Sequence, residues 1–402
     1  MIRIDRRRLL ADMRKLAEFG KVGTGVDRPA FSAADMEARA WLRERMTDAA
    51  LDAEIDGVGN VFGRSRANGP SVLIGSHSDS VPRGGWLDGA MGVVYGIEIV
   101  RADSENADRR AVDVIAFEDE EGSYLPVLGS RSFCGDLGDN EIDDARSASG
   151  ESLATAIANA GIADKPPARF EDGRYRAYLE AHIEQGPRLE AEGPKIGIVT
   201  AIVGIRRFRV AFAGRADHAG TTPMSMRLDA GSALIRMAGD LIDVFERNAG
   251  PETVWNIGKA IFEPGAANVV PNRAEFLFEF RDTDSATMDA LEQRLSEIVQ
   301  KANAAGPVVV TAERTANIAP TPMDPVFGEA IEAATREVGA ISMRLPSGGG
   351  HDAMVMARYM PTAMLFVPSI GGRSHDVEED TDEDDIVLGC EVLARVVDRL
   401  LD

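Results

Sequence analysis

The chain has 402 residues, 44% hydrophobic and 27% charged, the balance of a soluble globular protein with two or three domains. Its formal net charge of −22 excludes a nucleic-acid partner, because no basic surface is available to neutralise phosphates. Two cysteines, Cys134 and Cys390, exclude a disulfide framework and are typical of a reducing cytoplasm. No signal peptide or run of about 18 apolar residues is evident, so we expect a cytoplasmic protein with no membrane partner.

Short apolar runs in the first and last thirds of the chain predict buried strands. They are SVLIGS (71–76), AVDVIAF (111–117) and TAMLFV (362–367). Helical patterns lie between them, at 91–102 and 327–339. Strands that alternate with helices are typical of an α/β domain around a mostly parallel sheet. We therefore expect residues 1–205 and 317–402 to build one such domain together.

The middle of the chain has a different pattern, in the order β-α-β-β-α-β. Strands are expected at 206–214, 253–263, 273–282 and 306–314, and helices at 228–247 and 288–303. This order is that of a ferredoxin-like module. We therefore expect an inserted α+β domain at 206–316.

Histidines and carboxylates follow several of the apolar runs. The candidate ligands are His77 directly after the first run, Asp88 beside a glycine pair, Glu121 at the end of the acidic run 118–121, His182 in EAHIEQGP and His375 in GGRSHDVEE. Open α/β sheets bind small molecules and ions at the carboxyl ends of their strands. Histidine with carboxylate suits zinc, manganese, cobalt or nickel. Three histidines and two carboxylates are enough for two ions that share a bridging carboxylate.

Each of these positions also has a simpler interpretation. A single histidine in a globular protein usually packs in the interior or lies at the surface. An acidic run such as 118–121 is usually a solvated face. The coincidence of such residues with strand ends favours a metal site, but spacing alone leaves both interpretations open.

Seven stretches of the chain resemble those of the amidase/hydantoinase/carbamoylase family. They are GSHSDSVPRGGWLDGAMGV, EDEEGSY, AHIEQGP, GRADHAGTTPM, NVVPNRAEF, GGGHDA and GGRSHDVEE. This family, within the two-metal aminoacylase and carboxypeptidase clan (peptidase family M20), includes N-carbamoyl-L-amino-acid hydrolases, allantoate amidohydrolases, β-ureidopropionases and ureidoglycolate amidohydrolases. The resemblance covers nearly the whole chain, in the family's order. It implies a zinc-exopeptidase-like sheet domain with a ferredoxin-like lid and dimerisation domain.

The resemblance also implies a binuclear amidohydrolase that cleaves the C–N bond of an N-carbamoyl amino acid or related ureido acid. The implied ligands are His77 and His182 for one ion, Glu121 and His375 for the other, and Asp88 as the bridge. Glu120 would deprotonate the water between the metals and later protonate the leaving nitrogen. Asp79 would orient the imidazole of His77; the simpler interpretation of this residue is a turn.

Further residues are implied to contact the substrate. His218 would stabilise the oxyanion from the other subunit of a homodimer, although without the family it lies simply in a loop after a strand. Asn268 and Arg281 would hold the substrate carboxylate, and Gln185 and His351 would line the site. Without the family, Arg281 is a surface charge at a strand end.

Four residues depart from the family's usual pattern near the implied site. They are Tyr124 in EEGSYL, Arg373 before the Ser-His pair, Val377 in place of proline, and the bulky Trp86. None removes an implied ligand, but they leave the substrate open, and Tyr124 and Arg373 are candidate specificity residues. Arg373 either meets an additional anionic group or forms a salt bridge with Asp376 or Glu378.

Two alternative functions remain beside the ureido-acid hydrolase. One is hydrolysis of an N-acyl or peptide amide, as elsewhere in the clan. The other is a binding protein that kept the fold and lost catalysis. The presence of Glu120 and of all five implied ligands argues against the second.

Overall fold

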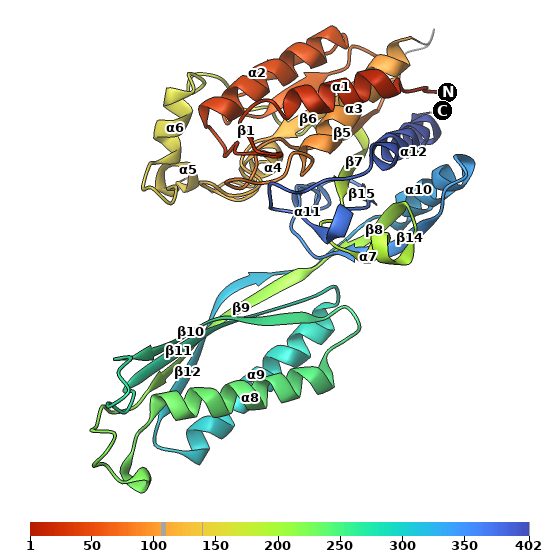
Figure 1. Ribbon diagram of the computed structural model, residues 1–402. Helices are drawn as coiled ribbons and strands as arrows, with labels where there is room; N and C mark the ends of the chain where they lie inside the picture. The colour runs from red at the N-terminus through yellow and green to blue at the C-terminus, as the bar shows by residue number, and fades with distance from the viewer. Residues whose placement is uncertain (106–109, 139, 402) are drawn as a thin grey trace. The chain divides into compact units, whose positions relative to one another are not determined.

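A computed structural model of the chain describes residues 1–105, 110–138 and 140–401. It contains two compact units (Figure 1). The first comprises Met1–Thr200 and Met323–Asp402, and the second comprises Ala201–Pro322. The second unit is thus an insertion into the first along the chain.

The first unit is built around a mixed sheet, with nine strands among the described residues. Its centre is parallel and consists of β15 (Thr362–Val367), β7 (Tyr175–Ile183), β5 (Ser71–His77) and β6 (Val112–Phe117), in that order. The runs predicted at 71–76, 111–117 and 362–367 correspond to β5, β6 and β15, whereas β7 was not predicted. The edges are antiparallel and comprise β4 (Val61–Arg64) and β3 (Asp52–Ile55) on one side, and β8 (Ile196–Ile202) and β13 (Thr321–Pro322) on the other.

Strands β8 and β13 lie at the two ends of the inserted unit in the sequence and pair with each other. Thr321 lies opposite Ile202, and Pro322 lies opposite Ala201. The chain therefore leaves and re-enters the sheet at neighbouring positions. The remaining strands are β14 (Ser342–Ser347), which pairs with β8, and the short pair β1 (Lys21–Val22) and β2 (Gly25–Val26).

Long helices cover this sheet. They are α1 (Arg6–Leu16), α2 (Ala33–Asp48), α3 (Ala90–Ser104), α10 (Pro325–Glu337) and α12 (Glu383–Leu401). Helix α3 is apolar almost all round and packs on β5 and β6, while α12 packs on β15 and α3. Shorter helices occupy the connections: α4 (Leu128–Cys134), α5 (Glu141–Asp144), α6 (Leu153–Asn159), α7 (Arg188–Glu192), α11 (Ala353–Met356) and η2 (Ile370–Gly372). Every described helix falls short of the length and apolar character that crossing a bilayer requires.

The second unit, all of whose residues are described, has a four-stranded antiparallel sheet in the order β10-β11-β9-β12. Its strands are β9 (Gly204–Ala213), β10 (Val254–Glu263), β11 (Arg273–Asp282) and β12 (Val309–Ile318), and its helices are α8 (Ala230–Asn248), α9 (Ser285–Ala305) and the short η1 (Met224–Met226). This is the predicted β-α-β-β-α-β order. The last strand runs beyond the predicted 314, because its pairing with β9 continues to Ile318.

Alternating side chains give the second unit its core. In β11, Phe276, Phe278 and Phe280 are buried against the helices, whereas Glu279 and Arg281 are only partly buried. Phe245 of α8 packs edge-on against Phe278, with ring centroids 4.8 Å apart. The period of two along the strand and the apolar stripes of α8 and α9 therefore meet in one aromatic cluster.

Candidate metal centre

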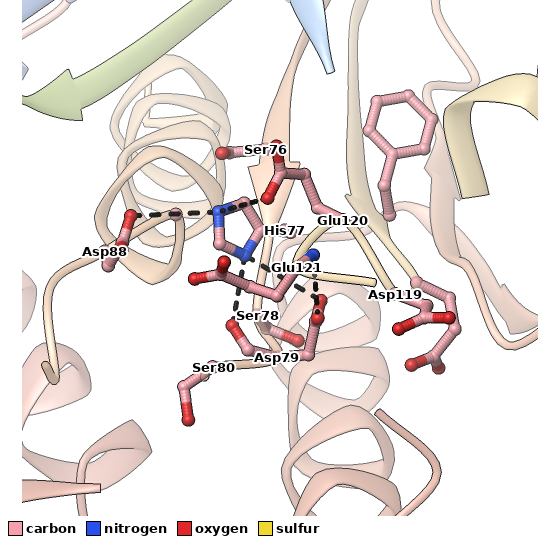
Figure 2. Close-up of polar contacts among 12 residues, drawn as sticks. Ser76, His77, Ser78, Asp79, Ser80, Asp88, Asp119, Glu120 and Glu121 are labelled. Atoms are coloured by element: carbon pink, nitrogen blue, oxygen red, sulfur yellow. Dashed lines mark hydrogen bonds and ion pairs between the residues drawn. The ribbon is translucent and has the colours of Figure 1, made fainter. Parts of the chain in front are cut away.

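Three neighbouring parallel strands carry charged side chains at or just after their carboxyl ends. His77 is the last residue of β5, His182 is the next to last of β7, and β6 ends at Phe117, just before Glu120 and Glu121. Strands β5, β6 and β7 are hydrogen-bonded in parallel, so their carboxyl ends lie side by side. Figure 2 shows Glu120, Glu121 and Asp88, the last from the loop before α3, gathered around the imidazole of His77.

Asp88 lies at the centre of this cluster. Its Oδ1 is 2.9 Å from Nε2 of His182 and 3.8 Å from Nε2 of His77. Its Oδ2 is 3.3 Å from Nε2 of His375, which is in turn 3.5 Å from Oε1 of Glu121. The structure thus brings together all five residues that the sequence analysis named as ligands.

The ligand atoms form groups of the size that a metal ion requires. In each of three groups the atoms lie within 4.8 Å of one another. The groups are His77–Asp88–His182, His77–Glu120–Glu121 and Asp88–Glu121–His375. Imidazole nitrogens with carboxylate oxygens are a donor set that suits zinc and the neighbouring divalent metals.

The electrostatics of the cluster fit a divalent cation. Burial opposes ionisation of Asp88, but the neighbouring histidines, with His182 foremost, hold its pKa well below the ordinary value. Burial and the charge of Asp88 raise the pKa of Glu121 to about 8. Burial and the carboxylate of Asp352 raise the pKa of Glu120 well above its ordinary range. Carboxylates this reluctant to ionise are short of compensating positive charge, which a divalent cation supplies.

Both buried histidines are oriented by backbone carbonyls. His77 Nδ1 lies 3.0 Å from the carbonyl oxygen of Asp79, and His182 Nδ1 lies 2.9 Å from that of Ile183. Because a carbonyl oxygen only accepts, Nδ1 of each ring donates, and in the neutral ring Nε2 then carries the lone pair that a metal needs. The Asp79 carboxylate, expected to orient His77, is 3.7 Å from Nδ1, and its Oδ2 instead accepts a hydrogen bond from the backbone N–H of Glu121. Asp79 therefore reaches His77 mainly through its carbonyl group.

Gln185 and His351 lie beside the cluster, where the sequence analysis expected them. Gln185 Nε2 donates to Oδ2 of Asp88 at 3.1 Å. His351 is buried, with its ring centroid 4.5 Å from that of His182 and its Nε2 2.7 Å from Oγ of Ser347. Burial lowers the pKa of His351 well below its ordinary value, so this ring is neutral.

Strained backbone accompanies the cluster. Asp119, Gln185 and His375 adopt φ of 55°, 57° and 55°, in the left-handed region that side chains other than glycine rarely occupy. Such strain persists where surrounding structure imposes it, and it concentrates at functional sites.

The residues that depart from the family pattern have partners within the first unit. The hydroxyl of Tyr124 donates to Oε2 of Glu151 at 2.7 Å, and its ring meets that of Phe31 edge-on. Arg373 forms an ion pair with Glu378, which is one of the two interpretations that the sequence left open. Two other functional candidates, Ser374 and Glu379, were missed, although both lie in the quoted motif GGRSHDVEE.

The remaining predicted residues, His218, Asn268 and Arg281, belong to the second unit. His218 is exposed, and the N–H of Ala219, next to it, donates to the carbonyl of Asn268 at 3.0 Å. Arg281 forms an ion pair with Glu279, at 2.8 Å.

Arg281 lies apart from His218 and Asn268. Asn268 precedes the start of β11 at Arg273, whereas Arg281 is near its end. Arg273 and Arg281 are eight residue steps apart along an extended strand, a distance of about 26 Å. One substrate carboxylate therefore cannot contact both Asn268 and Arg281 of the same chain, and the expectation that both bind it requires two copies.

Comparisons with known proteins place the chain in a family. Residues 73–399 match the family described as peptidase family M20/M25/M40. The chain is 35% identical to an N-carbamoyl-L-amino-acid amidohydrolase of Paenarthrobacter aurescens, over 98% of this chain and 97% of that protein. It is 32% identical to the allantoate amidohydrolase of Bacillus subtilis, over 96% of this chain and 95% of that protein.

Solved structures agree with this assignment. The crystal structure of an amidase of the hydantoinase/carbamoylase family from Burkholderia phymatum is 47% identical in sequence and superimposes with a TM-score of 0.94. The match covers 100% of this chain and 98% of that one. The chain therefore belongs to the M20 peptidase family of hydrolases and, within it, to the amidase/hydantoinase/carbamoylase group.

Proposed function

We propose that the chain is a binuclear-metal amidohydrolase that cleaves the C–N bond of an N-carbamoyl amino acid or a related ureido acid. The observation that carries the proposal is the convergence of five ligand side chains, with Asp88 common to two of the groups. A bridging carboxylate is what two adjacent ions require. The named activities of the relatives, on N-carbamoyl-L-amino acids and allantoate, support the ureido class of substrate.

The chain offers ligands for two ions. One would be held by His77 and His182 and the other by Glu121 and His375, with Asp88 shared. Zinc, manganese, cobalt and nickel all suit these donors. When bound, such a metal pair activates water for attack on a carbonyl carbon and polarises that carbonyl.

Glu120 is placed to move the protons of this reaction. Its side chain is largely buried, with Oε2 3.8 Å from Nε2 of His77. Burial and Asp352 raise its pKa, which favours a group that takes a proton from water and returns it to the departing nitrogen. Neutral His351 beside His182 adds no competing positive charge at the metal ligands.

Recognition of the substrate carboxylate falls to the second unit. Arg281 carries a planar guanidinium of the kind that binds a carboxylate, and its Nε and Nη2 donate to Oε1 of Glu279, which holds the side chain in place. Because Asn268 and His218 lie at the other end of this sheet, we assign them to the site of a second subunit. The enzyme would then be a homodimer in which His218 stabilises the oxyanion across the interface.

A substrate panel tests the proposed reaction. Steady-state turnover of zinc- and manganese-reconstituted protein is measured with N-carbamoyl-L-amino acids, N-carbamoyl-β-alanine, allantoate and ureidoglycolate, each beside matched N-acetyl and dipeptide analogues. Preference for a carbamoyl compound is expected. Preference for an acyl or peptide amide would move the enzyme to the peptidase-like activity of the wider family, and silence across the panel would refute the ureido assignment.

Mixed subunits test the shared site. Dimers that combine one His218→Ala subunit with one Glu120→Gln subunit retain one complete site if His218 acts across the interface. We therefore expect each single variant to be inactive and the verified mixed dimer to regain part of the activity. A mixed dimer as inactive as its parents contradicts the assignment of His218 to the partner's site.

A further inference from the structure

Glu379 is a buried carboxylate that joins two of the loops carrying candidate ligands. It is only 1% exposed. Its Oε1 accepts hydrogen bonds from the backbone N–H groups of Leu87, at 3.1 Å, and Asp88, at 3.0 Å. Its Oε2 accepts a hydrogen bond from the hydroxyl of Ser374, at 2.9 Å. Since Ser374 immediately precedes His375, one side chain fixes both sides of the contact between Asp88 and His375.

The close approach of Glu379 depends on a glycine. A Cβ atom at Gly85 would lie 1.9 Å from the carboxyl carbon and from Oε1 of Glu379. Any side chain at this position would push the carboxylate away from its N–H donors. The glycine pair before Trp86 thus makes room for the carboxylate as well as for a turn.

Glu379 also decides where the hydrogen of Ser374 points. Ser374 Oγ lies 2.9 Å from Oε2 of Glu379 and 3.4 Å from Oδ2 of Asp88, and it carries one hydrogen. Because one hydrogen serves only one of these acceptors well, the hydroxyl donates to the nearer oxygen, that of Glu379. Gln185 Nε2 then donates both to Ser374 Oγ, at 3.2 Å, and to Asp88 Oδ2, at 3.1 Å. Asp88 Oδ2 keeps a lone pair toward His375 that Ser374 does not occupy.

We infer that Glu379, acting with Ser374, is a positioning residue that holds Asp88 and His375 in the arrangement needed by the ion of the Asp88–Glu121–His375 group. It acts through the backbone of Asp88 and the hydroxyl of Ser374, not as a ligand. The inference rests on the proposed two-metal function, because it concerns the affinity for one of the two ions. Substitution of a residue that orients metal ligands typically lowers metal affinity by about 10–100-fold.

Zinc binding to metal-stripped protein tests this inference without any assay of activity. Affinity is measured by competition with a chromophoric chelator, and stoichiometry by elemental analysis, for wild type, Glu379→Gln and Ser374→Ala. In Glu379→Gln the amide oxygen can still accept from Leu87 and Asp88, but the NH₂ group turns toward Ser374 and frees its hydroxyl to donate to Asp88. We expect the affinity for one zinc ion to fall about tenfold or more and that for the other to stay unchanged. Ser374→Ala should give a smaller loss at the same ion.

Asp113→Asn is the matched control. Asp113 is also a buried carboxylate that accepts from a backbone N–H, that of Ser65 at 2.8 Å, but it lies at the beginning of β6 instead of its carboxyl end. This variant should lower thermal stability and leave both zinc affinities unchanged. Thermal unfolding of the metal-free proteins shows which variants fold. If Glu379→Gln does not fold, the zinc affinities of Ser374→Ala test the inference.

The outcomes separate the inference from the proposed function. Three results overturn the inference alone: wild-type affinity for both ions in Glu379→Gln and Ser374→Ala, an equal loss of affinity at both ions in Glu379→Gln, or a loss in Asp113→Asn as large as that in Glu379→Gln. Failure of the wild-type chain to bind two zinc ions overturns the two-metal function and the inference together.

Discussion

Replacement of Arg39 by methionine removes a buried cation that several carboxylates share. The side chain of Arg39 is fully buried, with Nε 2.9 Å from Asp35 and 2.6 Å from Glu118, and Nη2 3.8 Å from Asp79. Its Nη groups also donate to the carbonyl oxygens of Gly59, Ala116 and Phe117, at 3.1 to 3.3 Å. Methionine fills a similar volume but removes the positive charge and the N–H donors that these groups share. Removing one member of a buried ion pair costs about 3–5 kcal/mol, and we expect a loss of this size in the free energy of unfolding.

Urea unfolding of metal-free protein measures this loss in the first unit. In a Trp255→Phe background the remaining tryptophans, Trp41 and Trp86, both lie in the first unit, so fluorescence reports its unfolding. The matched control is Arg344→Met, which breaks an ion pair with Glu332 whose side chains are 44% and 40% exposed.

The control separates burial from the chemical change itself, since both variants replace arginine by methionine. An exposed pair contributes at most about 1 kcal/mol, because water and salt screen it. Losses of equal size in Arg39→Met and Arg344→Met, or a loss below 1 kcal/mol in Arg39→Met, would refute the reasoning from burial.

Three further substitutions test the site and the second unit. Glu120→Gln should lower kcat by about 10²–10⁴-fold with an unchanged metal content by elemental analysis, and retained turnover would contradict its role in proton transfer. Arg281→Lys should raise KM about tenfold for a carboxylate substrate by removing the bidentate contact, and an unchanged KM would show that the carboxylate binds elsewhere. Phe278→Ala should destabilise the second unit by about 3–5 kcal/mol, because Phe278 is fully buried against Phe245. A loss below 1 kcal/mol in the free energy of unfolding, measured by thermal unfolding, would contradict this expectation.

Strands β5 and β15 were predictable because they are apolar runs that no charged residue interrupts before His77 and Val367, respectively. Strand β7 was missed because Arg176 and Glu180 interrupt its apolar pattern. Glu180 is nevertheless fully buried, where Ser76, Tyr178 and the N–H of Ala353 donate to it. A charged residue with distant donors cannot be distinguished from a solvated one in a single sequence.

The same reason hides the carboxylates and arginines that support the site. Glu379 follows Glu378 in an acidic stretch that is typical of a solvated face, yet its donors, Leu87 and Asp88, lie more than 290 residues earlier in the chain. Arg39 stands in a helix with several charged neighbours, and only tertiary structure places it against Glu118. The local pattern predicts which side chains lie at a strand end. The residues that hold those side chains in place are determined by contacts between distant segments.

The pairing of β8 with β13 has a consequence for redesign of the chain. Because Ile202 and Thr321 are direct partners in an antiparallel ladder, residues 203–320, nearly all of the second unit, occupy the place of a hairpin turn. A two-residue turn could join the same two strands without changing their register. Replacement of residues 203–320 by such a turn would therefore leave β5, β6 and β7, and the candidate ligands at their carboxyl ends, in place.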